Sequence, residues 1–99
     1  MKNIGQKMDV KRIKEVKFEG EYLNGDINGK VKEYHENGQI KYEGEFLNGE
    51  RNGKGKEYNN NDVLKFEGEY LNGQRNGKGK EYYYDGELKF EGEYAKYYI

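Results

Sequence analysis

Residues 42–65 read YEGEFLNGERNGKGKEYNNNDVLK, and this stretch recurs along the chain with a spacing of 24 residues. The preceding copy, residues 18–41, reads FEGEYLNGDINGKVKEYHENGQIK, and the following copy, residues 66–89, reads FEGEYLNGQRNGKGKEYYYDGELK. A partial fourth copy, residues 90–99, starts with FEGEY and then departs from the pattern. A fixed period of this length is typical of repeat architectures, in which one supersecondary unit stacks on the next.

Apolar and charged residues alternate in one segment of each copy. In the third copy, Leu64, Phe66, Gly68 and Tyr70 share one parity, and the residues between them are Lys or Glu. This alternation predicts a β-strand with one apolar face and one charged face. The equivalent sets in the other copies are Val16, Phe18, Gly20 and Tyr22; Ile40, Tyr42, Gly44 and Phe46; and Leu88, Phe90, Gly92 and Tyr94.

Segments that contain Lys-Glu-Tyr are predicted to be return strands between these apolar strands. They span residues 30–35, 54–59 and 78–84. Seven strands in this order predict an all-β fold, a single-layer antiparallel β-meander of repeated hairpins. We expect the repeat domain to cover residues 16–99, with a first strand that starts near Ile13. Residues 1–15 are then an N-terminal extension, either a frayed tail or a segment that caps the first edge of the sheet.

Two kinds of turn are expected to join the strands. The first lies in the LNGxxNG stretch, for example residues 47–53, where Asn-Gly accommodates positive φ without a steric penalty. The second is tighter and has Gly38, Asp62 and Gly86 at equivalent positions. Because the middle turn lacks the glycine, it is expected to be the most strained.

Gly44 and Gly68 fall inside predicted strands, where a glycine weakens pairing unless an aromatic ring packs over the bare backbone. We expect the rings of Tyr34, Tyr58 and Tyr82 to provide this cover. Replacing Gly68 by valine should then destabilise the fold more than β propensity predicts.

The charged face has a pattern of its own. Glu43 and Glu67 are expected to lie two strands apart, and the return strand between them carries Lys54 and Lys56. Cross-strand pairs of opposite charge contribute about 0.2–1 kcal/mol each and help to fix the register. This face is expected to be solvated.

Composition excludes several classes of function. The chain has 99 residues, enough for one domain with a small core. Its 18 Lys and Arg side chains nearly balance 19 Asp and Glu, giving a net charge of -1, so no basic surface for nucleic acid is expected. The absence of cysteine excludes disulfides and thiolate metal sites. Without an apolar run typical of a signal peptide or a membrane span, a soluble cytoplasmic protein is the default expectation.

The polar residues offer no independent catalytic or metal site. The glutamates recur in every copy and are matched by lysines, whereas a catalytic carboxylate pair is unique and environmentally split. His35 is the only histidine, and its equivalents are Asn59 and Tyr83, so it cannot belong to a multi-histidine metal site. GKGK at residues 53–56 and 77–80 lacks the GxxxxGK[ST] spacing of a phosphate-binding loop. We expect no catalysis, no cofactor and no metal.

The aromatic face is the best candidate for a binding surface. A single-layer sheet has no second layer, so this face is covered by a partner, covered by the N-terminal segment or left open as a groove. Tyrosine-rich surfaces provide amphipathic contact area at low entropic cost, which favours a partner peptide or helix along the groove. The predicted partner-binding residues are Tyr22, Tyr34, Tyr42, Phe46, Tyr58, Phe66, Tyr70, Tyr82, Phe90 and Tyr94.

These residues carry a family resemblance. Tyr42, Gly44, Gly49, Gly53 and Gly55 follow a Tyr-x-Gly-x4-Gly-x3-Gly-x-Gly pattern that resembles the MORN repeat, and the third copy repeats it with Phe for Tyr. The first copy departs from the pattern, because Val31 stands where the last glycine of the pattern is expected. The second half of each unit looks more like the 24-residue MORN variant common in bacterial proteins. The resemblance covers most of the chain. It implies an elongated, twisted sheet of hairpins that serves as a scaffold, a protein-docking surface or a lipid-associated module, with any catalysis in another domain.

Three hypotheses of function remain. The leading one is a non-catalytic scaffold or interaction module with a protein partner. The alternative is a phospholipid or membrane-surface module, against which the neutral charge balance counts. The third is a small enzyme, for which no site residue can be named.

The fourth copy is expected to form the last edge of the sheet. After Tyr94, residues 95–99 replace the Leu-Asn-Gly turn, so no return strand is expected and the backbone of the last strand stays unpaired. We expect this edge to mediate end-to-end association of two copies or the docking of a partner strand. In the alternative, the tail folds back as a cap.

Overall fold

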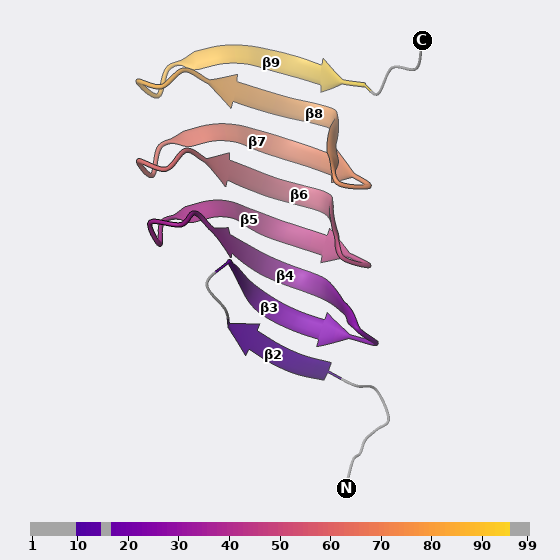
Figure 1. Cartoon of the computed structure of the whole chain (residues 1–99). Coiled ribbons are helices and arrows are strands. Elements are labelled where there is room, and N and C mark those ends of the chain that lie inside the picture. The colour runs from indigo at the N-terminus through magenta and orange to yellow at the C-terminus, as the bar shows by residue number, and fades with distance from the viewer. Residues whose placement is uncertain (1–9, 15–16, 96–99) are drawn as a thin grey trace, which may run out of the picture.

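The computed structural model describes residues 10–14 and 17–95, and it shows one antiparallel sheet (Figure 1). Its strands lie side by side in chain order, which confirms the predicted single-layer meander of hairpins. None of the described residues belongs to a helix that could cross a lipid bilayer. The eight strands are β2 (Val10–Lys14), β3 (Phe18–Leu23), β4 (Asp26–Tyr34), β5 (Ile40–Leu47), β6 (Glu50–Tyr58), β7 (Leu64–Leu71), β8 (Gln74–Tyr82) and β9 (Leu88–Tyr94).

Strand β2 is an addition to the seven predicted strands. We expected one strand from near Ile13 onward, but Ile13 lies in β2, which ends at Lys14 and pairs antiparallel with β3. Residue 16, the predicted start of the first apolar set, lies outside the described residues. Strand β2 therefore lines the edge of β3, which is the location that we considered for a capping segment.

The register shows why β2 forms here. In the pairing of β2 with β3, Lys14 lies opposite Glu19 and Ile13 opposite Gly20. The pairing of β4 with β5 has the same pattern, with Lys32 opposite Glu43 and Val31 opposite Gly44. The sequence RIKEV at residues 12–16 thus corresponds to KVKEY in the first copy. Strand β2 is a degenerate return strand, and the repeat begins earlier than we expected.

The first kind of turn is shorter than predicted. Asn48 has φ 51° and Gly49 has φ 85°, and the equivalent pairs of the other copies also have positive φ, as two-residue hairpin turns require. The return strands therefore start at the residue after this Asn-Gly, for example at Glu50, and not at the predicted Lys54. The second Asn-Gly lies inside the strand, where Gly53 has φ 96° beside a register shift between β5 and β6.

In the second kind of turn, Asp62 stands where the other copies have glycine, and that this turn is the most strained stays a prediction. Gly38 and Gly86 have φ values of 89° and 94°, and Asp62 adopts the same left-handed conformation with φ 67°. The amide of Asp62 donates to the carbonyl of Asn59, and the Asn59 side chain accepts hydrogen bonds from the amides of residues 61 and 63. Neighbouring hydrogen bonds thus hold a side chain where glycine is preferred.

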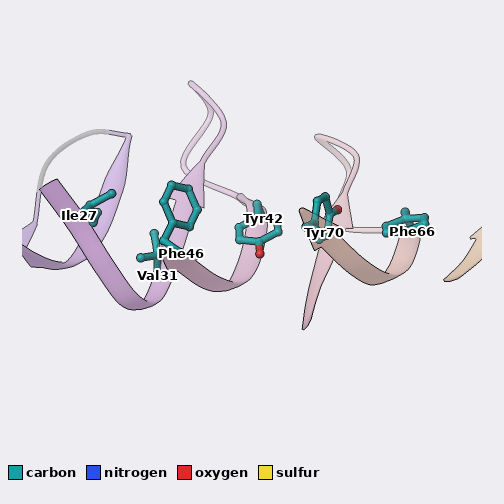
Figure 2. Close-up of a cluster of buried hydrophobic side chains, with 6 residues drawn as sticks. All are labelled: Ile27, Val31, Tyr42, Phe46, Phe66 and Tyr70. Carbon is teal, nitrogen blue, oxygen red and sulfur yellow. The ribbon is translucent and has the colours of Figure 1, made fainter. Parts of the chain in front are cut away.

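The core is a row of side chains along one face of the sheet (Figure 2). The rings of Tyr42 and Phe66 are fully buried, because each lies over glycines of its own and the next strand. A Cβ atom on Gly55 would lie 2.6 Å from Cζ of Tyr42, and one on Gly68 would lie 2.8 Å from Cζ of Phe66. The buried residues are Ile27, Val31, Tyr42, Phe46, Phe66 and Tyr70.

The rings that cover the strand glycines are therefore not the predicted ones. Tyr34, Tyr58 and Tyr82 follow the glutamates of the return strands and lie on the opposite face, where Tyr34 and Tyr82 donate to glutamates of the charged face. The cover comes from the ring two residues before each glycine, because this ring leans along its own strand.

We predict that Gly68→Val destabilises the fold by about 3 kcal/mol, because overpacking in a dense site forces the backbone to move. Its Cβ would lie 2.6 Å from the carbonyl oxygen of Lys78 and 2.7 Å from Cα of Gly79, and backbone atoms cannot swing away. Lys65→Val, at an exposed position of the same strand, is the matched control and should change stability by less than about 0.5 kcal/mol. Urea unfolding followed by circular dichroism measures both, and equal effects would contradict this packing.

We also predict that Asp62→Gly stabilises the protein by about 0.5–1 kcal/mol, because it removes the cost of a left-handed aspartate. The measurement is the change in thermal midpoint relative to the unmodified chain. The control is Asp85→Gly in the equivalent turn, where Gly86 already occupies the left-handed position and Asp85 accepts a hydrogen bond from the amide of Glu87. This control should destabilise, so stabilisation by both variants would contradict the explanation.

Candidate functional site

The aromatic face is a closed row of rings. Six edge-to-face contacts, with centroid distances from 5.2 to 6.4 Å, connect the rings of β3, β5, β7 and β9. Such pairs each contribute about 0.5–1.5 kcal/mol beyond the area they bury. In the order of their contacts across the sheet, the rings are Phe18, Phe46, Tyr42, Tyr70, Phe66, Tyr94 and Phe90.

Two arginines cover this row from the solvent side. The guanidinium of Arg51 lies 4.3 Å from the centroid of the Tyr42 ring, and that of Arg75 lies 4.1 Å from the centroid of the Phe66 ring. A guanidinium stacked on an aromatic face is attracted by the ring quadrupole and excludes water from the ring. The first copy has Ile27 at the equivalent position, and this isoleucine is buried in the core.

The arginines also join glutamates of successive return strands. Arg75 makes a two-pronged contact with Glu57, with Nε at 3.1 Å from Oε2 and Nη2 at 3.0 Å from Oε1. Its Nη1 lies 3.5 Å from Glu81, and Arg51 likewise joins Glu33 at 2.9 Å to Glu57 at 3.7 Å. The result is a continuous chain of alternating charges above the rings.

Electrostatics at Glu57 follow from this geometry. Burial alone would raise its pKa, but hydrogen bonds from Arg75 and Tyr70 and the positive charges of Arg75 and Arg51 outweigh burial, so the pKa is lowered. Burial raises the pKa of Tyr42 to about 12, so its hydroxyl stays neutral at physiological pH. These groups stabilise the fold and are not poised to exchange protons near pH 7.

The ten predicted partner-binding residues do not share one exposed face. Four are buried in the core: Tyr42, Phe46, Phe66 and Tyr70. Tyr22 and Tyr94 are partly buried against them, while Phe90 is 43% exposed on β9. The remaining three, Tyr34, Tyr58 and Tyr82, lie on the opposite face, so the prediction of one continuous aromatic groove is wrong in its geometry. Binding of a partner by any of the ten stays a prediction.

The opposite face carries a ladder of alternating charges. Lys56 lies opposite Glu43 on one side and Glu67 on the other, as the sequence predicted for the return strand. The same level of the sheet continues in both directions without a break in the alternation. From β3 to β9 the ladder is Glu19, Lys32, Glu43, Lys56, Glu67, Lys80 and Glu91.

This charged face is hollowed. A depression of about 710 Å³ crosses it from β3 to β8, and a second of about 530 Å³ continues it towards β9. The backbone of residues such as Gly44 and Gly55 forms the floor, and lysines and glutamates of the ladder form the sides. Hydrogen bonds to Glu19 and Glu67 hold the Tyr34 and Tyr82 rings beside the depression.

The described residues of the two faces show no catalytic constellation. His35 is partly buried, and its Nε2 lies 2.9 Å from the carbonyl oxygen of Tyr58, so Nε2 carries the proton and donates. Within residues 10–14 and 17–95, no group of three His, Asp or Glu side chains is placed to hold a metal ion. What the charged face can do chemically is bind an elongated, charged ligand.

Two features of the site were missed in the sequence. One is the role of Arg51 and Arg75, which could have been suggested by the recurrence of arginine after the Leu-Asn-Gly turn. The other is the depression, which has no signal in the sequence because it depends on how the sheet bends.

Comparison with known families agrees with the repeat pattern. The MORN repeat family matches residues 42–63 and 66–88, and the MORN repeat variant matches residues 27–48. Among curated proteins, no sequence matches this chain at a significant level.

We predict that Glu57→Gln destabilises the fold at pH 7 by about 2 kcal/mol, the scale of hydrogen bonds to a charged group. Because folding lowers the pKa of Glu57, its contribution is fully present above the ordinary value of 4.5 and is lost as the pH falls further. The difference in unfolding free energy between the unmodified chain and the variant should therefore shrink from pH 7 to pH 3.

The measurement is urea unfolding at several pH values. Glu43→Gln, an exposed carboxylate on the ladder, is the control for general loss of negative charge. A difference for Glu57→Gln that stays constant or grows towards pH 3 would contradict the assignment.

Proposed function

This chain belongs to the MORN-repeat family, and we propose that it is a non-catalytic scaffold that binds an elongated segment of a protein partner in the depression of its charged face. MORN repeats are generally non-enzymatic repeat modules. The proposal moves the binding surface from the aromatic face, where the rings are buried under Arg51 and Arg75, to the face that is open.

The observation that carries this proposal is the length of the depression. It extends across six strands, from β3 to β8, and five spacings of about 4.8 Å give about 24 Å. A helix of about 16 residues or an extended segment of about seven residues has this length. A small metabolite would fill only a fraction of the depression, so a peptide segment is the better match.

The charges along the depression define the chemistry of the partner. Lysines and glutamates alternate from strand to strand, so like charges repeat every two strands, at about 9.6 Å. A helix with like charges about two turns apart matches this period, with a residue of opposite charge one turn from each of them. In an extended strand, residues three apart face opposite sides, so a helix is the better match. We therefore propose a segment in which acidic and basic residues alternate and face the ladder with opposite sign.

Tyrosines add the apolar part of the proposed contact. Tyr58 and Tyr82 are partly buried on this face, and each presents a ring beside charged residues of the ladder. Tyrosine at the rim of a polar surface provides contact area with few rotatable bonds, which suits peptide binding.

The membrane-surface alternative has less support. Attraction to anionic lipid grows with uncompensated basic residues, whereas each interior lysine of the ladder lies between two glutamates. The experiment below therefore includes binding to lipid vesicles as a result that would contradict the proposed peptide binding.

The test starts with 16-residue peptides displayed on phage and selected on the unmodified chain. The selected peptides should bind Tyr58→Ala/Tyr82→Ala at least about tenfold more weakly, because two aromatic contacts are removed. Lys54→Glu/Lys78→Glu, which changes charges that line the depression, should also weaken binding but by less. Fluorescence anisotropy of each labelled peptide measures the affinities.

The matched control is Leu47→Ala/Leu71→Ala, two exposed leucines in β5 and β7 that do not line the depression. Selected peptides that bind all charged-face variants as well as they bind this control would overturn the proposal. The lipid function would instead be established by three results together. The unmodified chain sediments with phosphatidylserine vesicles, Lys54→Glu/Lys78→Glu abolishes this sedimentation, and the phage selection yields no binding peptide.

A further inference from the structure

The charge ladder ends on residues of opposite charge at the two ends of the sheet. Inside the sheet, each rung has neighbours of opposite charge on both sides: Glu67, for example, lies opposite Lys56 and Lys80. At β9, Glu91 lies opposite Lys80 alone, and at β2, Lys14 lies opposite Glu19 alone, among the strands that the structure describes. One edge therefore ends on an acid and the other on a base.

The edge strands as a whole repeat this difference. The sequence of β2, VKRIK, holds three basic residues and no acidic one. Strand β9, LKFEGEY, has two glutamates and one lysine. The two strands lie at opposite ends of the sheet, so they are too far apart to meet within one copy (Figure 1).

Strand direction allows the two edges to pair between copies. In an antiparallel meander, alternate strands run the same way, so β9 runs with β3, β5 and β7, and β2 runs with β4, β6 and β8. A β2 strand from a second copy, placed beside β9, would continue the alternation as an antiparallel neighbour. The sheet of one copy would then run into the sheet of the next without a change of strand order.

The register of such a pair follows from the repeat. Return strand β8 meets β7 with Lys80 opposite Glu67 and Gly79 opposite Gly68. Residues 12–14 of β2 pair with β3 as residues 78–80 of β8 pair with β9, so Lys14 corresponds to Lys80. If β2 of a second copy pairs with β9 as β8 pairs with β7, Lys14 of the second copy lies opposite Glu91. The same pairing places Ile13 of the second copy opposite Gly92.

The apolar side of this junction is open on β9. The ring of Phe90 is 43% exposed, whereas the equivalent rings of Tyr42 and Phe66 have no exposed surface. A Cβ atom on Gly92 would lie 2.8 Å from Cζ of Phe90, so a side chain opposite this glycine has the ring within reach. In the first copy Val31 stands at the equivalent register position beside Gly20, so a branched residue at this position is compatible with the repeat.

We propose that copies of this chain associate head to tail, with the β9 edge of one copy paired antiparallel to the β2 edge of the next, Lys14 opposite Glu91 and Ile13 opposite Gly92. The acidic edge meets the basic edge, the charge ladder continues across the junction, and backbone groups of β9 that have no partner among the described residues find one. Since the two contacting surfaces differ, the association is heterologous and forms open chains of copies, not a closed dimer.

Disulfide trapping tests the register directly, because the chain contains no cysteine of its own. Lys14→Cys and Glu91→Cys are made as separate variants and mixed in equal amounts under mild oxidation. Residues directly opposite each other on neighbouring antiparallel strands have Cβ atoms close enough for a disulfide. The expected result is a mixed disulfide dimer in at least about fivefold excess over either homodimer, identified by mass spectrometry.

The matched control mixes Lys14→Cys with Glu67→Cys, which lies at the same level of the ladder but inside the sheet, and should give no such excess. A chain that carries both Lys14→Cys and Glu91→Cys should form a series of reducible oligomers. Light scattering of the unmodified chain, which needs no variant, should show a mean mass that rises with concentration and falls in high salt.

Three outcomes would overturn the proposal. Homodimers of Glu91→Cys in excess would show that two β9 edges pair with each other. An equal yield of mixed dimer from the Lys14→Cys and Glu67→Cys control would show that the disulfides form by random collision. A monomeric mass of the unmodified chain up to about 1 mM, the weak limit of useful association, would show that the two edges do not pair.

Discussion

The structure depends on an aromatic ring lying flat over bare glycine backbone. Tyr42 covers Gly44 and Gly55, and Phe66 covers its own pair of glycines in the same way, so that rings of a single layer bury themselves without a second layer. A side chain at any of these glycines would meet ring or backbone atoms at less than 3 Å. The glycines are therefore required by packing, although glycine within a strand ordinarily weakens it.

The arginines complete the burial of the aromatic rings, which the glycines allow on the side of the backbone. Rings that lean over the backbone still expose one side to water, and Arg51 and Arg75 cover that side while their charges are matched by glutamates of the return strands. The guanidinium suits this position because it stacks with its flat face and forms hydrogen bonds with its edge. Two arginines and three glutamates thus take the place of the missing layer.

This division of labour leaves the charged face free. All buried side chains belong to one face, and the other carries a ladder that is satisfied within the sheet by charges on neighbouring strands. A face that does not hold the core can be used for binding, which is the basis of the proposed scaffold function. The same repetition makes the interior strands similar and the two edges different, which is why the proposed association between copies is assigned to the edges.

The sequence by itself determined the fold class, the order of the repeated strands and the segments in which both kinds of turn lie, because a period of 24 residues, the alternation within it and the Asn-Gly pairs are local signals. It did not show that only the first Asn-Gly of each LNGxxNG stretch forms the turn. The sequence also predicted that a return strand with lysines lies between Glu43 and Glu67, and the structure pairs Lys56 with both of them but Lys54 with Glu69. The tertiary structure alone decided which rings are buried, which face is hollowed and where β2 lies. Parity does place Tyr34, Tyr58 and Tyr82 on the charged face, because each follows a lysine of the ladder by two residues, so the prediction that they cover the strand glycines overlooked a signal in the sequence. Bulges, bending and the lean of a ring along its strand depend on contacts between strands, and a sequence read one residue at a time does not contain them.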